Sequence, residues 1–246
     1  MANAMLSDKT FAPESVAKLQ TNSASAGTMT LSATILRGFV LLALLLLTAS
    51  YGWSWMASQD LTTVRPWPFL IFWIVLLGIS MAAAFVPKLS FVLGPAYALL
   101  SGLWIGAISQ AYNAMYDGIV AQAALATVAV FFAVLSLYTL RIVRVSNRFV
   151  QVVVASTFGM LLLYLVAMVL QFFGISLFAI TPLGIGISAI AAIIASLNLF
   201  VDFRFIEEGI SADAPMYMAW YCAFGLLATL IWLYLEILRL LSYMRD

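Results

Sequence analysis

The sequence contains few of the residues that carry polar chemistry. Among its 246 residues there is no histidine and one cysteine, and only 9% are charged. The absence of histidine excludes Ser-His-Asp triads, imidazole metal sites and histidine acid–base catalysis. A single cysteine excludes an intrachain disulfide and a thiolate metal cluster, and Cys222 lies in an apolar run where an inert packing thiol is expected. We therefore expect neither an enzyme nor a bound cofactor.

Apolar residues dominate what remains. Hydrophobic residues make up 65% of the chain, and the mean hydropathy is +1.10. A soluble domain has about 45–50% apolar and about 25% charged residues, so this chain lacks the polar surface to face water on all sides. The 11 basic and 10 acidic residues give a net charge of +1, which offers no basic surface for nucleic acid. The lipid bilayer is the expected environment of most of the chain.

Seven stretches are long and apolar enough to cross a membrane, which takes about 20 residues as a helix. The predicted spans are Ile35–Met56, Trp67–Val86, Phe91–Tyr112, Ile119–Leu140, Phe149–Phe173, Ser176–Val201 and Met216–Tyr243. Only Gly174 and Ile175 separate the fifth span from the sixth, so a six-span alternative stays open. The fold class is an all-α membrane protein.

The first 30 residues differ from the rest. Ser, Thr, Ala and Asn dominate residues 21–30, and no apolar run suited to a core occurs there. No basic segment opens the chain as in a signal peptide. We expect residues 1–30 to form a flexible polar tail and residues 31–246 to form the membrane domain.

Basic residues predict the orientation of the chain in the membrane. In the seven-span arrangement one side carries eight of them: Lys9, Lys18, Arg37, Lys88, Arg141, Arg144, Arg148 and Arg204. The other side carries Arg65, Arg239 and Arg245. Because Lys and Arg concentrate on the cytoplasmic side, the N-terminus is expected inside the cell.

Small residues in the third and sixth spans indicate close helix packing. Gly102 and Gly106 are four residues apart and therefore share a helix face. Gly184 and Gly186 are likewise expected to allow close helix packing in the sixth span. Pro182 with Gly184 is also expected to kink that helix. These residues predict a compact bundle but no activity.

Ionisable residues at membrane depth are the candidates for function. Asp202 ends the sixth apolar run, and Arg204 follows it in a predicted loop. One alternative is that Asp202 is an interfacial acid, which caps the helix or pairs with Arg204. The other is that Asp202 is a functional acid. Glu236 and Arg239 lie within the last apolar run. Either the two residues form a local pair near the outer interface, or Glu236 faces the centre of the bundle.

Four segments carry a family resemblance. They are DFRFIEEG from Asp202 to Gly209, the following AWYCAFG, LYLEILRLL from Leu233 to Leu241, and ALLSGLWIGAIS in the third span. Together these segments resemble the bacterial branch of the Bax inhibitor-1 family, over roughly residues 31–246. The resemblance implies a seven-helix bundle in the cell membrane, with the last helix central.

The resemblance also implies a function. Members of the family are pH-sensitive calcium leak channels, and some bacterial members regulate a membrane-bound AAA protease. Their pH sensor is a pair of acids, of which Asp202 matches the first and Glu236 is the candidate for the second. Lys88 is the nearest match to a basic residue on the second helix of some relatives.

The separation of the two acids leaves two alternatives. Glu236 follows Asp202 by 34 positions, so on straight antiparallel helices the two side chains would not meet. Either the seventh helix is broken near Gly225, or the two-acid contact is absent.

Two functions are therefore expected. The first is a pH-sensitive calcium or cation leak channel that uses Asp202, Glu236, Arg204 and Arg239, with Ca²⁺ as a transient ligand. The alternative is a non-conducting regulator whose tail binds a membrane AAA protease or another membrane partner. An intramembrane enzyme is disfavoured, because a two-aspartate protease would need Glu236 or a loop residue as its second acid.

Overall fold

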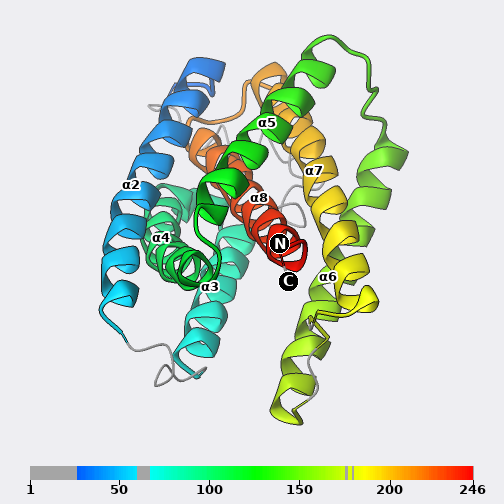
Figure 1. Ribbon diagram of the computed structural model, residues 1–246. Helices are drawn as coiled ribbons and strands as arrows, with labels where there is room; N and C mark the ends of the chain where they lie inside the picture. Colours follow the sequence, from blue (N-terminus) through cyan, green and yellow to red (C-terminus); the bar gives the residue numbers. More distant parts are fainter. Residues whose placement is uncertain (1–26, 60–66, 175–176, 179, 246) are drawn as a thin grey trace.

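The computed structural model describes residues 27–59, 67–174, 177–178 and 180–245. Within these residues the chain forms seven α-helices and one short 3-10 helix (Figure 1). They are α2 (Leu31–Ala57), α3 (Trp67–Phe85), η3 (Pro87–Leu89), α4 (Ser90–Met115), α5 (Ile119–Thr139), α6 (Asn147–Phe172), α7 (Pro182–Ser211) and α8 (Tyr217–Tyr243). The predicted all-α fold is confirmed.

Three helices begin at a hydroxyl residue that caps the first turn. Thr30, Ser146 and Thr181 each accept a hydrogen bond from the backbone N–H three residues later, at the starts of α2, α6 and α7. Such caps bind N–H groups that have no partner inside the helix. They fix the helix starts, whereas the apolar runs alone only indicate where a helix lies.

The helices have the length and composition of membrane spans. Six of them are long and apolar enough to cross a bilayer, and the seventh, α3, contributes a shorter apolar stretch, Ile71–Phe85, within the described residues. Many large apolar side chains point outward from the bundle, including Phe39, Leu47 and Leu162. Such a surface suits lipid, and the backbone polar groups are satisfied within the helices. The protein is a multi-pass membrane protein.

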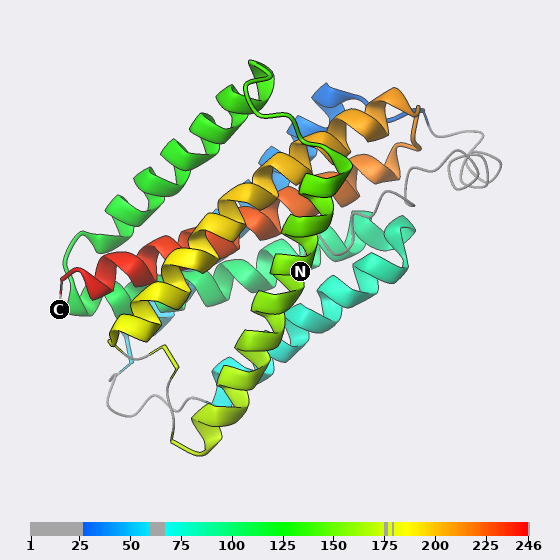
Figure 2. The same ribbon diagram turned by 90° about the vertical axis from the view of Figure 1, so that its right-hand side faces the viewer.

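The most extensive helix contact joins α2 and α4. A Cβ atom at Gly106 would lie 2.0 Å from the backbone oxygen of Ala49, and one at Gly52 would lie 2.2 Å from that of Leu103. Gly102 faces the same contact, where the space for a Cβ is also occupied. Glycine lets the two backbones approach this closely. Elsewhere, α8 packs against α2, α4, α5 and α7, and Figure 2 shows α7 and α8 running side by side.

The segment before α2 is part of the bundle. Met29 is 2% exposed, and its backbone N–H donates to the oxygen of Ala214 at 2.7 Å. The N–H of Met216 donates to the oxygen of Gly27 at 3.0 Å. Residues 27–30, expected within the tail, thus bind the α7–α8 connection, while residues 1–26 of the predicted tail lie outside the described residues.

The sixth helix differs from the prediction at both ends. It was expected over Ser176–Val201, but α7 covers Pro182–Ser211. Helix α7 starts at its Thr181 cap with Pro182 in the first turn, where proline suits the helix, so the expected kink at Pro182 is wrong. Arg204 lies in the helix rather than in a loop. Helix α6 ends at Phe172 and α7 begins at Pro182, so the fifth and sixth apolar runs form two separate helices.

The last helix is continuous. Helix α8 runs from Tyr217 to Tyr243 and passes through Gly225 without interruption. The alternative of a break near Gly225 is therefore wrong.

Candidate functional site

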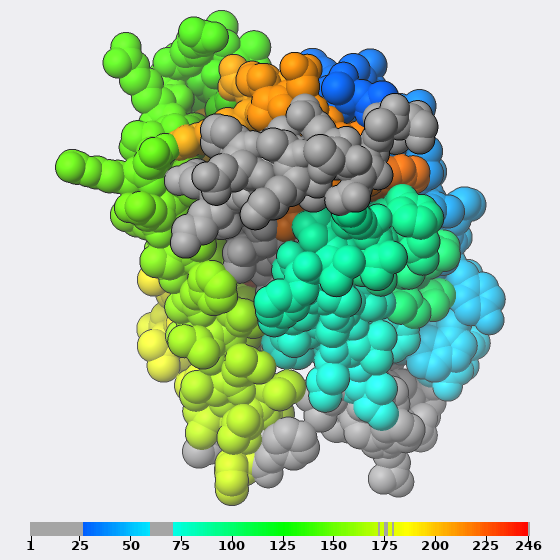
Figure 3. Space-filling view, turned by 180° about the vertical axis from the view of Figure 1, so that it is seen from behind, coloured from blue at the N-terminus to red at the C-terminus, as the bar shows by residue number. Residues whose placement is uncertain are grey.

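A cavity of about 160 Å³ lies inside the bundle. Side chains of α3, α4, α6 and α8, together with one residue of α7, line it. Helices α3 and α6 form two of its walls and lie side by side on the face shown in Figure 3. The lining is mostly apolar, but its polar members come from five helices: Ser80, Tyr97, Ser101, Thr157, Tyr164, Asn198 and Thr229.

A buried hydrogen-bonded pair forms one side of this cavity. The side-chain amide of Asn198 on α7 donates to the hydroxyl of Thr157 on α6 at 2.8 Å. The same amide donates to the backbone oxygen of Ile194 at 2.8 Å. Both residues are buried, so the pair links α6 to α7 at the depth of the apolar core.

Asp202 lies one turn beyond Asn198 on α7. It is 1% exposed, and neither carboxylate oxygen accepts a hydrogen bond from a described residue. Thr229 of α8 faces the carboxylate, but its hydroxyl donates to the backbone oxygen of Gly225 at 3.2 Å. An ionised carboxylate in this position lacks compensation, which costs several kcal/mol. Asp202 is thus a buried acid within the helix, and the prediction of an interfacial cap is wrong.

Glu236 is equally buried but fully paired. It is 1% exposed, and Arg239 donates to both of its carboxylate oxygens at 3.0 Å. The hydroxyl of Tyr164 on α6 donates to Glu236 at 2.7 Å and accepts from the indole N–H of Trp232 at 2.8 Å. The local pair predicted for Glu236 and Arg239 forms, and the carboxylate also faces a neighbouring helix.

Aromatic contacts hold Arg239 in place. Its guanidinium carbon lies 4.5 Å from the ring centroid of Phe178, a cation–π distance. The hydroxyl of Tyr243 donates to the backbone oxygen of Phe178 at 2.8 Å. The positive charge beside Glu236 therefore has contacts with α8 and with the α6–α7 connection.

The two acids do not meet. Asp202 faces Thr229, and Glu236 follows Thr229 on α8 by seven residues, which is about 10 Å along a helix. Neither acid lines the cavity, but Thr229 beside Asp202 and Tyr164 beside Glu236 do. The structure thus keeps apart an acid paired with Arg239 and an acid that has no ion-pair partner among the described residues.

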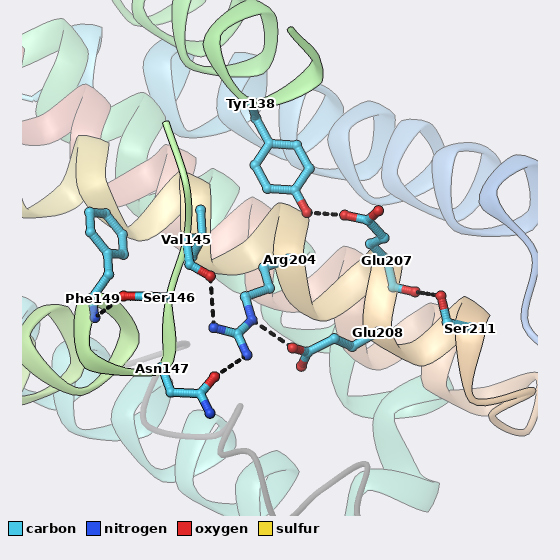
Figure 4. A network of polar contacts seen from close by, with 9 residues as sticks. All are labelled: Tyr138, Val145, Ser146, Asn147, Phe149, Arg204, Glu207, Glu208 and Ser211. Atoms are coloured by element: carbon cyan, nitrogen blue, oxygen red, sulfur yellow. Dashed lines mark hydrogen bonds and ion pairs between the residues drawn. The ribbon is translucent and has the colours of Figure 1, made fainter. Parts of the chain in front are cut away.

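Arg204 belongs to a different network at the end of the bundle (Figure 4). Its guanidinium donates to Glu208 at 2.6 Å, to the backbone oxygen of Val145 at 2.8 Å, and to the side-chain oxygen of Asn147. The predicted alternative of a pair between Arg204 and Asp202 is therefore wrong. Arg204 holds the α5–α6 connection against α7, away from the cavity.

The predicted packing glycines separate into two groups. Gly102 and Gly106 lie at the close α2–α4 contact. Gly184 is buried and donates its N–H to the Thr181 cap at 3.2 Å. At Gly186 a Cβ would meet nothing within 4 Å, so the expected close approach there is wrong.

Sequence reasoning missed several residues of this site. Tyr164 and Thr157 lie on α6, which carries no acid or base of the site, and only the structure brings them to Glu236 and Asn198. A usable signal was spacing. Asn198 precedes Asp202 by four positions and Trp232 precedes Glu236 by four, which places each pair on one helix face.

Comparison with known proteins supports the sequence resemblance. The family model described as Bax inhibitor 1 like matches residues 5–246, nearly the whole chain. No curated protein matches the chain. Because the family match spans almost all of the sequence, this protein belongs to the Bax inhibitor 1-like family.

Proposed function

We propose that this protein is a pH-sensitive cation leak channel with Ca²⁺ as its transported ion. The observation that carries the proposal is the Asp202 carboxylate, which is buried at membrane depth, faces the Thr229 hydroxyl and has no ion-pair partner among the described residues. Intramembrane acids are rare and costly, and they mark ion and proton pathways. A carboxylate without a cationic partner can take up a cation or a proton.

The cavity begins beside this acid, because Asn198, one turn before Asp202, and Thr229, which faces it, both line the cavity. Its volume of about 160 Å³ corresponds to roughly five water molecules, enough for a partly hydrated ion. The hydroxyl and amide oxygens of Ser101, Thr157, Asn198 and Thr229 are the neutral oxygen ligands that Ca²⁺ accepts together with carboxylates. In this account an ion leaves water at one end, passes Asp202 and enters the cavity.

Glu236 closes the other side of the route. Arg239 occupies both of its oxygens, so the carboxylate offers nothing to a cation in this arrangement. Conduction therefore requires Arg239 to leave Glu236. We regard the structure as a closed state of the pathway.

Protons and cations compete for Asp202 in this mechanism. Protonation removes the negative charge that attracts the ion, so acidification is expected to reduce the flux. The pH response then comes from one acid and does not need the two-acid contact of the resemblance.

The arrangement in the membrane completes the proposal. Helix α8 serves as the central helix, supported by its packing against α2, α4, α5 and α7 and by the hydrogen bond between Glu236 and Tyr164 of α6. The N-terminus lies inside a bacterial cell. The basic α5–α6 connection, with Arg141, Arg144 and Arg148, supports this orientation.

Calcium flux into dye-loaded liposomes tests the proposal. Wild-type protein is expected to admit Ca²⁺, and Asp202→Asn is expected to lower the rate at least tenfold because the substitution removes the charge but keeps the shape. Asp213→Asn is the matched control, since Asp213 is exposed on the α7–α8 connection. Equal rates for wild type and Asp202→Asn would contradict a pathway through Asp202.

A second function is supported by the separation of the two acids. Because Asp202 and Glu236 do not meet and Glu236 is fully paired, the scaffold is also suited to a non-conducting regulator of a membrane AAA protease or another membrane partner. This reading predicts that the intact chain co-purifies with such a partner and that a chain lacking residues 1–26 does not. Capture that survives the deletion would exclude binding through the tail.

A further inference from the structure

The connection between α5 and α6, together with the first turn of α6, carries three exposed arginines that the proposed channel does not use. Arg141, Arg144 and Arg148 are all exposed, and no described acid forms an ion pair with any of them. The nearby acids are occupied elsewhere. Glu208 pairs with Arg204, and Glu207 accepts from the hydroxyl of Tyr138 (Figure 4).

Arg141 occupies a backbone position that favours glycine. Its φ is +55°, and it follows the last turn of α5 with the hydrogen bonds of a Schellman motif. The N–H of Arg141 donates to the oxygen of Tyr138 at 2.9 Å, and that of Ile142 donates to Leu137 at 3.1 Å. A non-glycine residue in this conformation is strained, and such an outlier points to a role for its side chain.

The connection is also held in a defined shape. Arg204 binds the backbone oxygen of Val145 at 2.8 Å and the side chain of Asn147. Ser146 accepts a hydrogen bond from the N–H of Phe149 at 3.2 Å, which starts α6. These contacts hold the α6 end of the connection and the Schellman motif holds its α5 end, so the three arginines lie on an ordered segment.

Apolar side chains lie between the arginines and outside the bundle. Leu140 is 69% exposed and Ile142 is 63% exposed, on either side of Arg141. The connection joins two membrane spans, so it lies at the membrane–water interface. Interleaved basic and apolar side chains at this depth match a lipid surface, where the apolar groups enter the acyl region and the cations face the headgroups.

We propose that residues 140–148, which comprise the α5–α6 connection and the start of α6, are a binding site for the headgroups of anionic phospholipids. Guanidinium groups bind phosphate oxygens with paired hydrogen bonds, which makes arginine well suited to this contact. The excess positive charge selects anionic over zwitterionic lipids. Each arginine near an anionic surface contributes roughly a fivefold gain in affinity.

Lipid retention by the purified full-length protein tests the site. Native mass spectrometry counts the phosphatidylglycerol and phosphatidylcholine molecules that stay bound, and thermal unfolding in each lipid reports stabilisation. Wild type is expected to retain more phosphatidylglycerol and to unfold at a higher temperature in it. The triple variant Arg141→Gln, Arg144→Gln, Arg148→Gln is expected to lose this difference, and the corresponding triple lysine variant is expected to keep most of it.

Arg141→Gly separates binding from folding. Glycine relieves the left-handed strain, so stability in phosphatidylcholine is expected to be equal or higher, while phosphatidylglycerol retention falls roughly fivefold. Lys88→Gln, an exposed cation on η3 before α4, is the control and is expected to change retention less than Arg141→Gly.

Three results would overturn the proposal. The first is an unchanged phosphatidylglycerol preference in the triple glutamine variant. The second is an equal loss in Lys88→Gln and Arg141→Gly, which would indicate a general charge effect. The third is an equal thermal shift with inorganic phosphate, which would indicate an anion site without lipid recognition.

Discussion

At the scale of single residues, the two buried acids differ in how the negative charge of the carboxylate is compensated. Glu236 has Arg239 and Tyr164 as donors, whereas Asp202 has no donor among the described residues. The first arrangement stabilises a charge inside the bundle. The second leaves a buried charge without an ion-pair partner among the described residues, which is why we propose a functional role for Asp202.

The Glu236–Arg239 pair predicts a measurable coupling. Arg239→Gln leaves Glu236 without its cation and is expected to lower the free energy of unfolding by about 3–5 kcal/mol. The double variant Glu236→Gln with Arg239→Gln removes both charges and is expected to recover most of that loss. Denaturation in detergent measures both values. A double variant no more stable than the single one would show that the pair is not coupled.

Part of this residue chemistry was predictable from the sequence. The spacing of Glu236 and Arg239 places them on one helix face, and the local pair was an expected alternative. The hydrogen bond from Tyr164 to Glu236 was not predictable from the sequence. Tyr164 is 72 positions away from Glu236, and the residue it meets depends on how α6 packs against the bundle. Apolar periodicity indicates that a residue is buried, but not which distant polar group it meets.

At the scale of helices, apolar runs predicted most spans but not the limits of α7. The apolar run ends at Val201, yet the helix continues to Ser211 because Phe205, Ile206 and Gly209 remain on its buried face. Charged residues on the other face shortened the predicted span. The same error placed Asp202 at a helix end, although it lies inside the helix.

The α2–α4 contact predicts a strong effect of a single methyl group. In Gly106→Ala the new Cβ would lie 2.0 Å from the oxygen of Ala49, so the helices must separate. We expect a loss of about 1–3 kcal/mol in the free energy of unfolding. Thermal or chemical unfolding in detergent measures this loss.

Gly186→Ala is the matched control for this prediction. It also lies within a helix, but its Cβ would meet nothing within 4 Å. Alanine there is expected to leave stability unchanged or to raise it by about 0.5–1 kcal/mol, through its higher helix propensity. Equal destabilisation by both variants would contradict close packing at Gly106.

At the scale of the whole molecule, charge is distributed unequally between the two ends. The end that holds the α5–α6 and α7–α8 connections carries six basic residues among those described: Arg37, Lys88, Arg141, Arg144, Arg148 and Arg204. At the opposite end Arg245 donates to the backbone oxygen of Asp117 at 2.7 Å. This asymmetry supports a cytoplasmic position for the basic end.

Cysteine labelling tests the orientation. The single native cysteine, Cys222, is buried, so the wild-type protein is expected to remain unlabelled by a membrane-impermeant maleimide. Asp117→Cys is expected to react in intact cells, and Arg144→Cys only after the membrane is permeabilised. The reverse pattern would place the N-terminus outside.

We propose that one buried acid without an ion-pair partner, Asp202, controls cation passage at the cavity. Calcium flux into liposomes, measured from mildly acidic to mildly alkaline pH for wild type and Asp202→Asn, tests it most directly. The account predicts a wild-type flux that falls on acidification and an Asp202→Asn flux that is low and independent of pH. A pH-dependent flux that persists in Asp202→Asn would contradict it.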